Sequence, residues 1–205
     1  MEKYLEYWDE LFSKPTTELK FSNNFELLIA VLLSAQCTDK RVNAVTENLF
    51  KKYKTPQDFS KLSQQELEKE IYSCGFYRKK SKSIINISRE IIDKHDGKVP
   101  NTIEKLKSLN GIGQKTASVI FSIGFGGDAI AVDTHVLRVS KRLGFSNAEN
   151  VKKCEEDLKK LIDKSLWSKT NSQMVLFGRY YCKARSPKCE TCKLKEICKY
   201  KLEQN

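Results

Sequence analysis

The sequence contains no long hydrophobic run. Its longest apolar stretch is Leu27 to Leu33, with Phe25 just before it, whereas a helix needs about 20 apolar residues to cross a bilayer. No segment resembles a secretory signal either. We therefore expect neither a membrane span nor export, and we predict a cytoplasmic protein.

Histidine and strand-like patterns are also scarce. The 205 residues include two histidines, His95 and His135, so catalysis by histidine is not expected. No run alternates apolar and polar residues as a half-buried strand does. No internal repeat, low-complexity tract or Pro/Gly/Ser linker separates parts of the chain. Any division into domains must therefore come from packing, without a flexible tether.

Acidic residues are outnumbered by basic ones. Thirty-seven Lys and Arg against 26 Asp and Glu leave a formal charge of +11. This excess favours a polyanionic partner, nucleic acid first, although a basic surface that only confers solubility is the alternative. Apolar residues make up 40% of the chain, enough for the core of one large or two small domains.

Helix signals are abundant. Asn23 and Glu26 predict a capping box that opens a nearly all-apolar helix, Phe25 to Ala35, buried among other helices. Two more helix starts are predicted, at Thr55-Pro56 and at Ser63-x-x-Glu66. Apolar residues recur at helical spacing in two further segments, Val42, Val45 and Leu49, then Ile84, Ile87 and Ile91. The predicted fold class is all-α.

Four of the seven cysteines fall within 17 residues near the end of the chain. They form a C-x6-C-x2-C-x5-C run: Cys182, Cys189, Cys192 and Cys198. Two disulfides are one interpretation, but the other three cysteines would leave an odd count. Zinc sites usually contain two C-x2-C pairs, whereas this run has one, so we favour an iron-sulfur cluster over zinc. Spacing alone leaves both metals open.

Two glycines interrupt the helical pattern at Gly111-Ile112-Gly113, just before Lys115. This predicts a tight helix-to-helix turn whose backbone can approach a phosphate, with free N–H groups at the start of the next helix. A simple helix-ending glycine without a ligand is the alternative. Asp133 follows Lys115 by 18 residues, in the segment Ala131-Val132-Asp133-Thr134-His135.

Together these motifs resemble the endonuclease III family of DNA glycosylases with apurinic-site lyase activity. The resemblance runs from Phe25 to Cys198. It implies a helix-hairpin-helix glycosylase fold with a six-helix barrel domain at 18–127 and an iron-sulfur domain at 1–17 and 128–205. DNA would bind across the cleft between the two domains. The four clustered cysteines would hold a [4Fe-4S] cluster, whose first expected role is to fix the conformation of a basic loop. Family hairpins commonly have proline where Asn110 stands, which predicts a slightly less rigid turn.

The resemblance assigns catalysis to Lys115 and Asp133. Lys115 supplies an amine that must be neutral to attack the sugar, so we expect its pKa to be lowered by desolvation and by the helix N-terminus. Its alternative is a phosphate-contacting lysine. Asp133 would stabilise cationic character on the sugar, and it could equally cap the helix that starts at Thr134. A Schiff base at Lys115 then permits β-elimination.

DNA contacts are expected from several segments. Gln36 would fill the gap left by a flipped base, and Phe76 would act as an apolar wedge, with core packing as its alternative. The basic residues Arg78, Lys79 and Lys80 would meet phosphates. The cluster loop adds Lys183, Arg185, Lys188, Lys193 and Lys195 as a basic surface. The other expected contacts are Gly111, Ile112, Gly113, Thr116 and His135.

The predicted function is therefore a bifunctional glycosylase and lyase. Its expected partner is double-stranded DNA containing damaged bases, oxidised or ring-saturated pyrimidines first, or abasic sites, and the protein is expected to be a monomer. Two alternatives remain: a monofunctional mismatch glycosylase, and a non-catalytic iron-sulfur protein that binds DNA. The presence of both Lys115 and Asp133 favours the enzyme.

Overall fold

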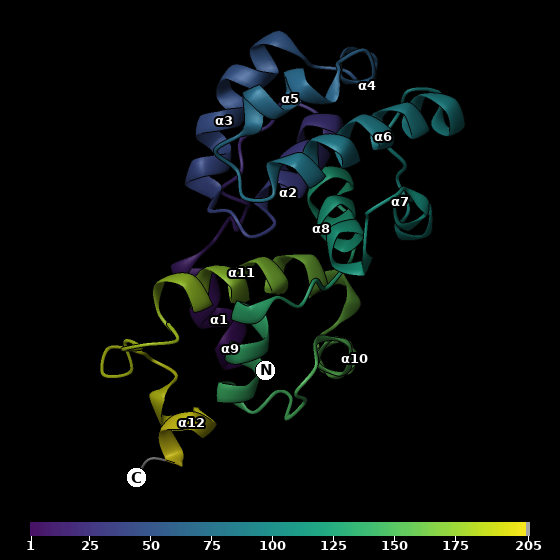
Figure 1. The fold of residues 1–205 in the computed structure, drawn as a ribbon. Coiled ribbons are helices and arrows are strands. Elements are labelled where there is room, and N and C mark those ends of the chain that lie inside the picture. Colours follow the sequence, from purple (N-terminus) through teal and green to yellow (C-terminus); the bar gives the residue numbers. More distant parts are fainter. Residues whose placement is uncertain (204–205) are drawn as a thin grey trace. The chain divides into compact units, whose positions relative to one another are not determined.

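The computed structural model describes residues 1–203, whose regular structure is entirely helical, with no strand in that range. The predicted all-α class is confirmed. The chain forms two compact units, which we call the hairpin unit (Thr17–Phe125) and the cysteine unit (Met1–Thr16 together with Gly126–Asn205). Figure 1 shows their helices in sequence colours.

The hairpin unit is built around one buried helix. Its helices are α2 (Asn24–Ser34), α3 (Asp39–Lys52), α4 (Pro56–Ser60), α5 (Gln64–Ile71), α6 (Tyr77–His95), α7 (Ile103–Ser108) and α8 (Gln114–Phe125). Eight of the eleven residues of α2 are buried, and α2 packs against α3, α6 and α8. This confirms that the apolar segment is a central helix.

The start of α2 differs in detail from the predicted capping box. Asn23 Oδ1 accepts hydrogen bonds from the backbone N–H groups of Phe25 and Glu26, at 3.0 and 2.9 Å. The Glu26 carboxylate reaches one residue further back than in a standard box, to the N–H of Ser22 at 2.6 Å. Asn23 is the N-cap, as predicted, but the helix runs Asn24–Ser34 and so begins and ends one residue earlier than predicted.

Two other helix starts agree with the sequence. Ser63 and Glu66 form a reciprocal capping box at the start of α5. Thr55 caps α4, and Pro56 occupies its first turn. Local side chains therefore determine where these helices begin.

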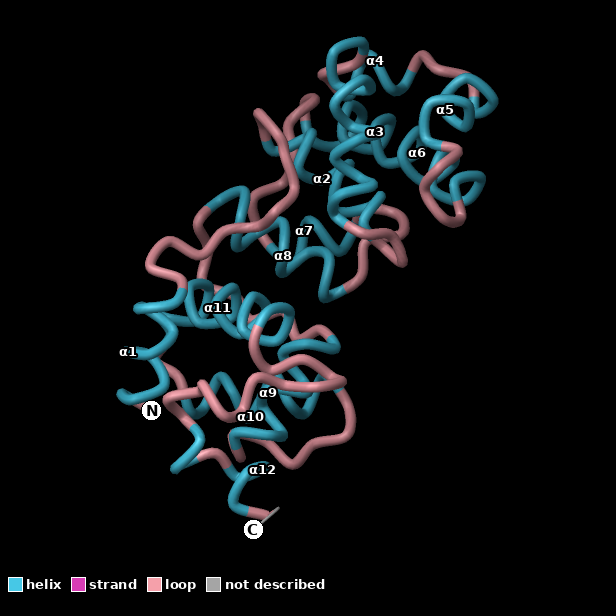
Figure 2. Tube along the Cα trace, turned by 90° about the vertical axis from the view of Figure 1, so that its left-hand side faces the viewer, coloured by secondary structure: helices cyan, strands magenta, loops and turns pink. Residues whose placement is uncertain are grey.

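The cysteine unit joins the two ends of the chain. Its helices are α1 (Glu2–Leu11), α9 (Thr134–Leu143), α10 (Val151–Leu161), α11 (Trp167–Tyr180) and α12 (Lys199–Leu202), with 3₁₀ turns at Lys164–Leu166 and Lys195–Ile197. Figure 2 shows these helices with the loops that connect them. Helix α9 packs against α10, α11 and α12, and α1 packs against α11.

Aromatic packing holds the N-terminal helix in this unit. Trp8 is fully buried, with its ring 6.0 Å from Phe177 and 6.1 Å from Phe145. The Tyr4 hydroxyl donates to the backbone oxygen of Ile197 at 3.1 Å. The cysteine segment therefore rests on a core to which both ends of the chain contribute. In the part of the chain that the structure describes, no helix is long and apolar enough to cross a membrane.

Candidate active site and iron-sulfur centre

The predicted hairpin lies between α7 and α8. Gly111 has φ +83°, in the left-handed region that favours glycine, and the N–H of Ile112 donates to Leu109 O at 3.1 Å. The N–H of Asn110 donates to Glu90 Oε2, on α6, at 2.9 Å. A proline at this position has no N–H to make that bond. Asn110 thus anchors the turn, which offsets the loss of rigidity expected from the missing proline.

The start of α8 is open to ligands. A Cβ placed on Gly113 would meet no atom within 4 Å, so the backbone here faces free space. Lys115 lies in the first turn and is exposed, while Thr116 is half-buried and Ile112 points into the core. Burial within the protein therefore does not supply the desolvation expected for Lys115. A bound ligand would have to cover this amine.

Asp133 is the N-cap of α9. Its Oδ1 accepts hydrogen bonds from the backbone N–H groups of His135 and Val136, both at 2.8 Å. The capping role anticipated for this residue is confirmed. Because both bonds use Oδ1, the carboxylate is fixed in orientation while Oδ2 takes no part in the cap. A fixed carboxylate of this kind can also stabilise a developing positive charge.

His135 is held inside the cysteine unit. Its Nδ1 lies 3.2 Å from Nη2 of Arg138, and the same guanidinium nitrogen donates to Gly178 O at 2.7 Å. A Cβ on Gly178 would lie 2.8 Å from the Cβ of His135, so α9 and α11 approach closely at this point. The half-buried ring therefore has a packing role in addition to any contact with DNA.

Gln36 follows the last turn of α2. It is exposed and has φ +54°, a left-handed conformation that is uncommon for glutamine. The ammonium of Lys80, on α6, donates to the backbone oxygens of Leu33 and Ala35, both at 2.8 Å. These two bonds hold the end of α2 immediately before Gln36.

Lys80 is buried, contrary to the prediction from the sequence. The side chain expected to meet a phosphate is 9% exposed and points into the hairpin unit. The reason is helical geometry: Lys80 lies on the face of α6 that turns toward α2, whereas its neighbours Arg78 and Lys79 are exposed. The phosphate contact remains open only to those two residues.

Phe76 is exposed, which excludes the core-packing alternative. It is 59% exposed, precedes α6 and has φ +59°. Its loop touches the loop of Gln36, since a Cβ on Gly75 would lie 3.5 Å from the backbone oxygen of Gln36. An apolar side chain of this size in water is a candidate for insertion into a partner.

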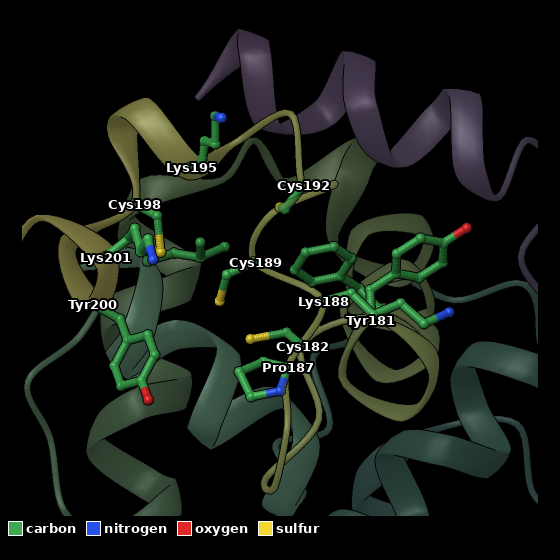
Figure 3. A pocket seen from close by; sticks show the side chains of 12 residues that line it. Tyr181, Cys182, Pro187, Lys188, Cys189, Cys192, Lys195, Cys198, Tyr200 and Lys201 are labelled. Atoms are coloured by element: carbon green, nitrogen blue, oxygen red, sulfur yellow. The ribbon is translucent and has the colours of Figure 1, made fainter. Parts of the chain in front are cut away.

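The four clustered cysteines line one cavity. Figure 3 shows Cys182, Cys189 and Cys198 directed into a common space, and Cys192 lines the same space. Within residues 1–203, no group of three His, Cys, Asp or Glu side chains could hold a single metal ion. Four thiolates from one short segment are the usual ligand set of a [4Fe-4S] cluster, so the residues present fit that group.

The pKa values of two of these thiols are raised. Burial raises the pKa of Cys192, and the neighbouring thiolates of Cys198, Cys182 and Cys189 raise it further. Burial likewise raises the pKa of Cys182. Without iron these thiols keep their protons, and binding of iron would release them.

Two arginines that the sequence analysis missed hold the cysteine loop. Arg138 Nε donates to Cys182 O at 3.1 Å. Arg142 donates to Lys183 O at 2.6 Å and to Cys182 Sγ at 3.4 Å. The available signal was their spacing of four residues on α9, which places both on one face. Such bonds to a ligand's sulfur and backbone orient the site.

The basic loop is less uniform than predicted. Lys183 and Arg185 are exposed. Lys193, in contrast, forms an ion pair with Glu10, and the ammonium of Lys188 lies 4.8 Å from the centre of the Tyr181 ring. All five predicted cations of the loop, Lys183, Arg185, Lys188, Lys193 and Lys195, are nevertheless exposed.

Two segments of this chain match known protein families. Residues 29–164 match the family model of HhH-GPD superfamily base excision DNA repair proteins, and residues 182–198 match that of the iron-sulfur binding domain of endonuclease III. The chain belongs to the HhH-GPD superfamily, and within it to the endonuclease III family. Endonuclease III from Bacillus subtilis (strain 168) is 47% identical over 191 residues, 93% of this chain and 87% of that protein. Endonuclease III from Escherichia coli (strain K12) is 42% identical over 187 residues, 91% of this chain and 89% of that protein.

Two solved structures of endonuclease III with DNA have a fold similar to that of this chain. A trapped covalent intermediate of endonuclease III with DNA, an estranged-adenine complex, matches with a TM-score of 0.92 at 46% identity and covers 100% of this chain and 98% of its own. A non-covalent endonuclease III–DNA complex matches with a TM-score of 0.94 at 47% identity and covers 99% and 95%. The protein is thus a DNA glycosylase and lyase of base excision repair that carries a [4Fe-4S] cluster.

Proposed function

We propose that Lys115 and Asp133 are the catalytic pair of this enzyme. The observation that carries the proposal is their placement at two helix starts: Lys115 in the exposed first turn of α8 after the hairpin, and Asp133 as the fixed cap of α9. The hairpin N–H groups would hold phosphate beside Lys115. Bound DNA would then cover the amine and provide the desolvation that the protein alone lacks.

The chemistry follows from these groups. A damaged base is flipped out of the duplex at a cost of a few kcal/mol. The neutral amine of Lys115 attacks the sugar C1′ as the bond to the base breaks, and the base leaves with the electron pair. Asp133 stabilises the positive charge that develops on the sugar and accepts a proton from the amine. The C1′–O4′ bond of the sugar then breaks, O4′ takes a proton, and C1′ and the Lys115 nitrogen form a Schiff base. The Schiff base acidifies the C2′ hydrogen, so loss of that proton allows β-elimination to expel the 3′ phosphate, and water then releases Lys115.

The proposed substrate is double-stranded DNA that contains an oxidised or ring-saturated pyrimidine, or an abasic site. Gln36 and Phe76 support this, because two exposed side chains on adjoining loops can fill the space of a flipped base. The phosphate backbone of the DNA would be contacted by the hairpin residues Gly111, Ile112, Gly113 and Thr116, by the exposed Lys183 and Arg185, and by His135 at the start of α9. A charge of +11 suits this partner. We propose that the protein acts as a monomer on cytoplasmic DNA.

The cysteine run would bind the cluster. Cys182, Cys189, Cys192 and Cys198 are the proposed ligands. The cluster, when bound, supplies a rigid centre that fixes the basic loop, and no step above requires an electron from it. We propose that the hairpin unit works as the six-helix barrel domain, 18–127, and the cysteine unit as the cluster domain, 1–17 and 128–205, and that residues of both units contact DNA.

The catalytic assignment is tested on defined duplexes. The native protein should release an oxidised pyrimidine and cut the strand, whereas Lys115→Gln should lose both activities by about a hundredfold or more, since it removes the nucleophile. Asp133→Asn should slow base release more than cleavage of a preformed abasic site. Lys107→Gln, which removes an exposed lysine from α7, is the matched charge control. Base release without strand cleavage by the native protein would favour the monofunctional alternative.

The hairpin is tested separately. Because a Cβ on Gly113 meets nothing within 4 Å, Gly113→Leu should fold normally but obstruct the approach of a phosphate. Affinity for abasic duplex should fall while the circular dichroism spectrum and melting temperature stay unchanged. Unchanged affinity would contradict the placement of DNA at this turn.

A further inference from the structure

Two cysteines outside the cluster run lie together in the hairpin unit. Cys37 and Cys74 are separated by 37 residues in sequence, yet Cys37 packs against the core cluster that contains Cys74, and its thiol contributes to the raised pKa of Cys74. The surrounding backbone confirms that the two segments touch. A Cβ on Gly75 would lie 3.5 Å from Gln36 O, and Arg41 Nη1 donates to Ser73 O at 3.4 Å.

These cysteines lie beside the two side chains proposed to enter DNA. Cys37 follows Gln36 directly, and Cys74 precedes Phe76 by two residues. Both Gln36 and Phe76 have φ above +50°, which is strained for a residue with a side chain. The conformations of both loops are therefore sensitive to a bond that joins their neighbours.

The two thiols differ in access. Cys37 is half-buried, whereas Cys74 is fully buried. Burial, together with the neighbouring Cys37, raises the pKa of Cys74 to about 11, so Cys74 keeps its proton. The ammonium of Lys80 interacts electrostatically with both sulfurs. A small oxidant would thus meet Cys37 first, with Cys74 in position to respond.

We propose that Cys37 and Cys74 are a reversible dithiol–disulfide site, oxidised by a peroxide, that links the loops carrying Gln36 and Phe76. The Cys37 thiolate attacks one peroxide oxygen, the O–O bond breaks, and Cys37 becomes a sulfenic acid while the released hydroxide takes a proton to form water. The Cys74 sulfur then attacks the Cys37 sulfur. The S–O bond breaks, the S–S bond forms, and the second hydroxide takes the Cys74 proton. The two thiols lose two electrons, which the peroxide gains.

The disulfide should weaken DNA binding. This consequence rests on the proposed function, in which Gln36 and Phe76 enter the duplex. Independent adjustment of the two loops is lost when their neighbours are bonded, so at least one side chain inserts poorly. Affinity for abasic duplex should fall roughly tenfold, as for the loss of one stacked aromatic contact.

The test uses the cluster-containing protein treated with hydrogen peroxide. Remaining thiols are alkylated, and the peptides are mapped by mass spectrometry, while visible absorption monitors the cluster. The expected result is a peptide pair joined through Cys37 and Cys74, reversed by dithiothreitol. Cys154→Ala is the matched control, because it removes a buried cysteine from the cysteine unit and should leave the disulfide unchanged. Two unmodified thiols, or Cys37 as a sulfinic acid, would overturn the proposal.

A binding arm separates this proposal from the proposed function. The probe is a duplex with a tetrahydrofuran abasic analogue, which cannot form a Schiff base. Oxidation should lower the affinity of the native protein but not that of Cys37→Ala. A disulfide with unchanged affinity would overturn the effect on the loops. If even the reduced protein does not bind the probe while the disulfide forms, the proposed DNA site is wrong and the dithiol stands.

Discussion

Lys80 offers the sharpest test of how α2 presents Gln36. Its ammonium makes two hydrogen bonds of 2.8 Å to carbonyl oxygens at the end of α2. We predict that Lys80→Met keeps the length and much of the apolar packing of the side chain but leaves those two oxygens without their charged donor. Stability should fall, and the Gln36 loop should lose its anchor.

The magnitude follows from those two bonds. A hydrogen bond to a charged group contributes about 1.5–3 kcal/mol, so two contribute about 3–6 kcal/mol. Burial lowers the pKa of Lys80, which shows that holding the charge here has a cost that offsets part of this gain. Because of that cost, we expect a net loss below the lower end of this range, about 2 kcal/mol. With a urea dependence of about 2 kcal/mol per M, the unfolding midpoint should fall by about 1 M.

Urea unfolding followed by circular dichroism measures this change. Lys79→Met is the control, because Lys79 is the exposed neighbour on the same helix and should shift the midpoint little. Affinity for abasic duplex should also fall in Lys80→Met at urea concentrations where the protein remains folded. Equal midpoints for the two variants would refute the argument that Lys80 anchors α2.

Two further predictions concern the cysteine unit. Gly178→Ala should lower the free energy of unfolding by about 1–3 kcal/mol, since the added Cβ would lie 2.8 Å from the Cβ of His135. Thermal melting measures this loss of stability. An unchanged melting temperature would contradict the close approach of α9 and α11. In Arg142→Gln, the rate at which the cluster is lost to a chelator should rise roughly 10–100-fold, because the variant lacks the donors to Cys182 Sγ and Lys183 O. Visible absorption measures that rate, and equal rates would exclude Arg142 as a support of the loop.

Local signals in the sequence predicted much of the scaffold. Thr55 and Ser63 start helices because their hydroxyl groups bond to nearby N–H groups, an interaction that depends on a few consecutive residues. The burial of α2 followed from its unbroken apolar run. The Gly111 turn and the cysteine run were equally legible, because short spacing limits the conformations that such segments can adopt.

The features that sequence reasoning missed depend on contacts between distant segments. Lys80 looked like part of a solvated basic run, and only the packing of α6 on α2 shows that it is buried. Cys37 and Cys74 have no local pattern that pairs them. Phe76 was predicted as an apolar wedge with core packing as its alternative, and only the structure shows that its side chain is exposed. Such positions are decided by tertiary structure.

The most direct test of the central claim is to trap the covalent intermediate. Native protein is incubated with an abasic duplex in the presence of borohydride, which reduces a Schiff base to a stable amine, and the adduct is digested and mapped. The account predicts one protein–DNA adduct, joined through Lys115 and absent from Lys115→Gln. An adduct through another residue, or none with the native protein, would contradict it.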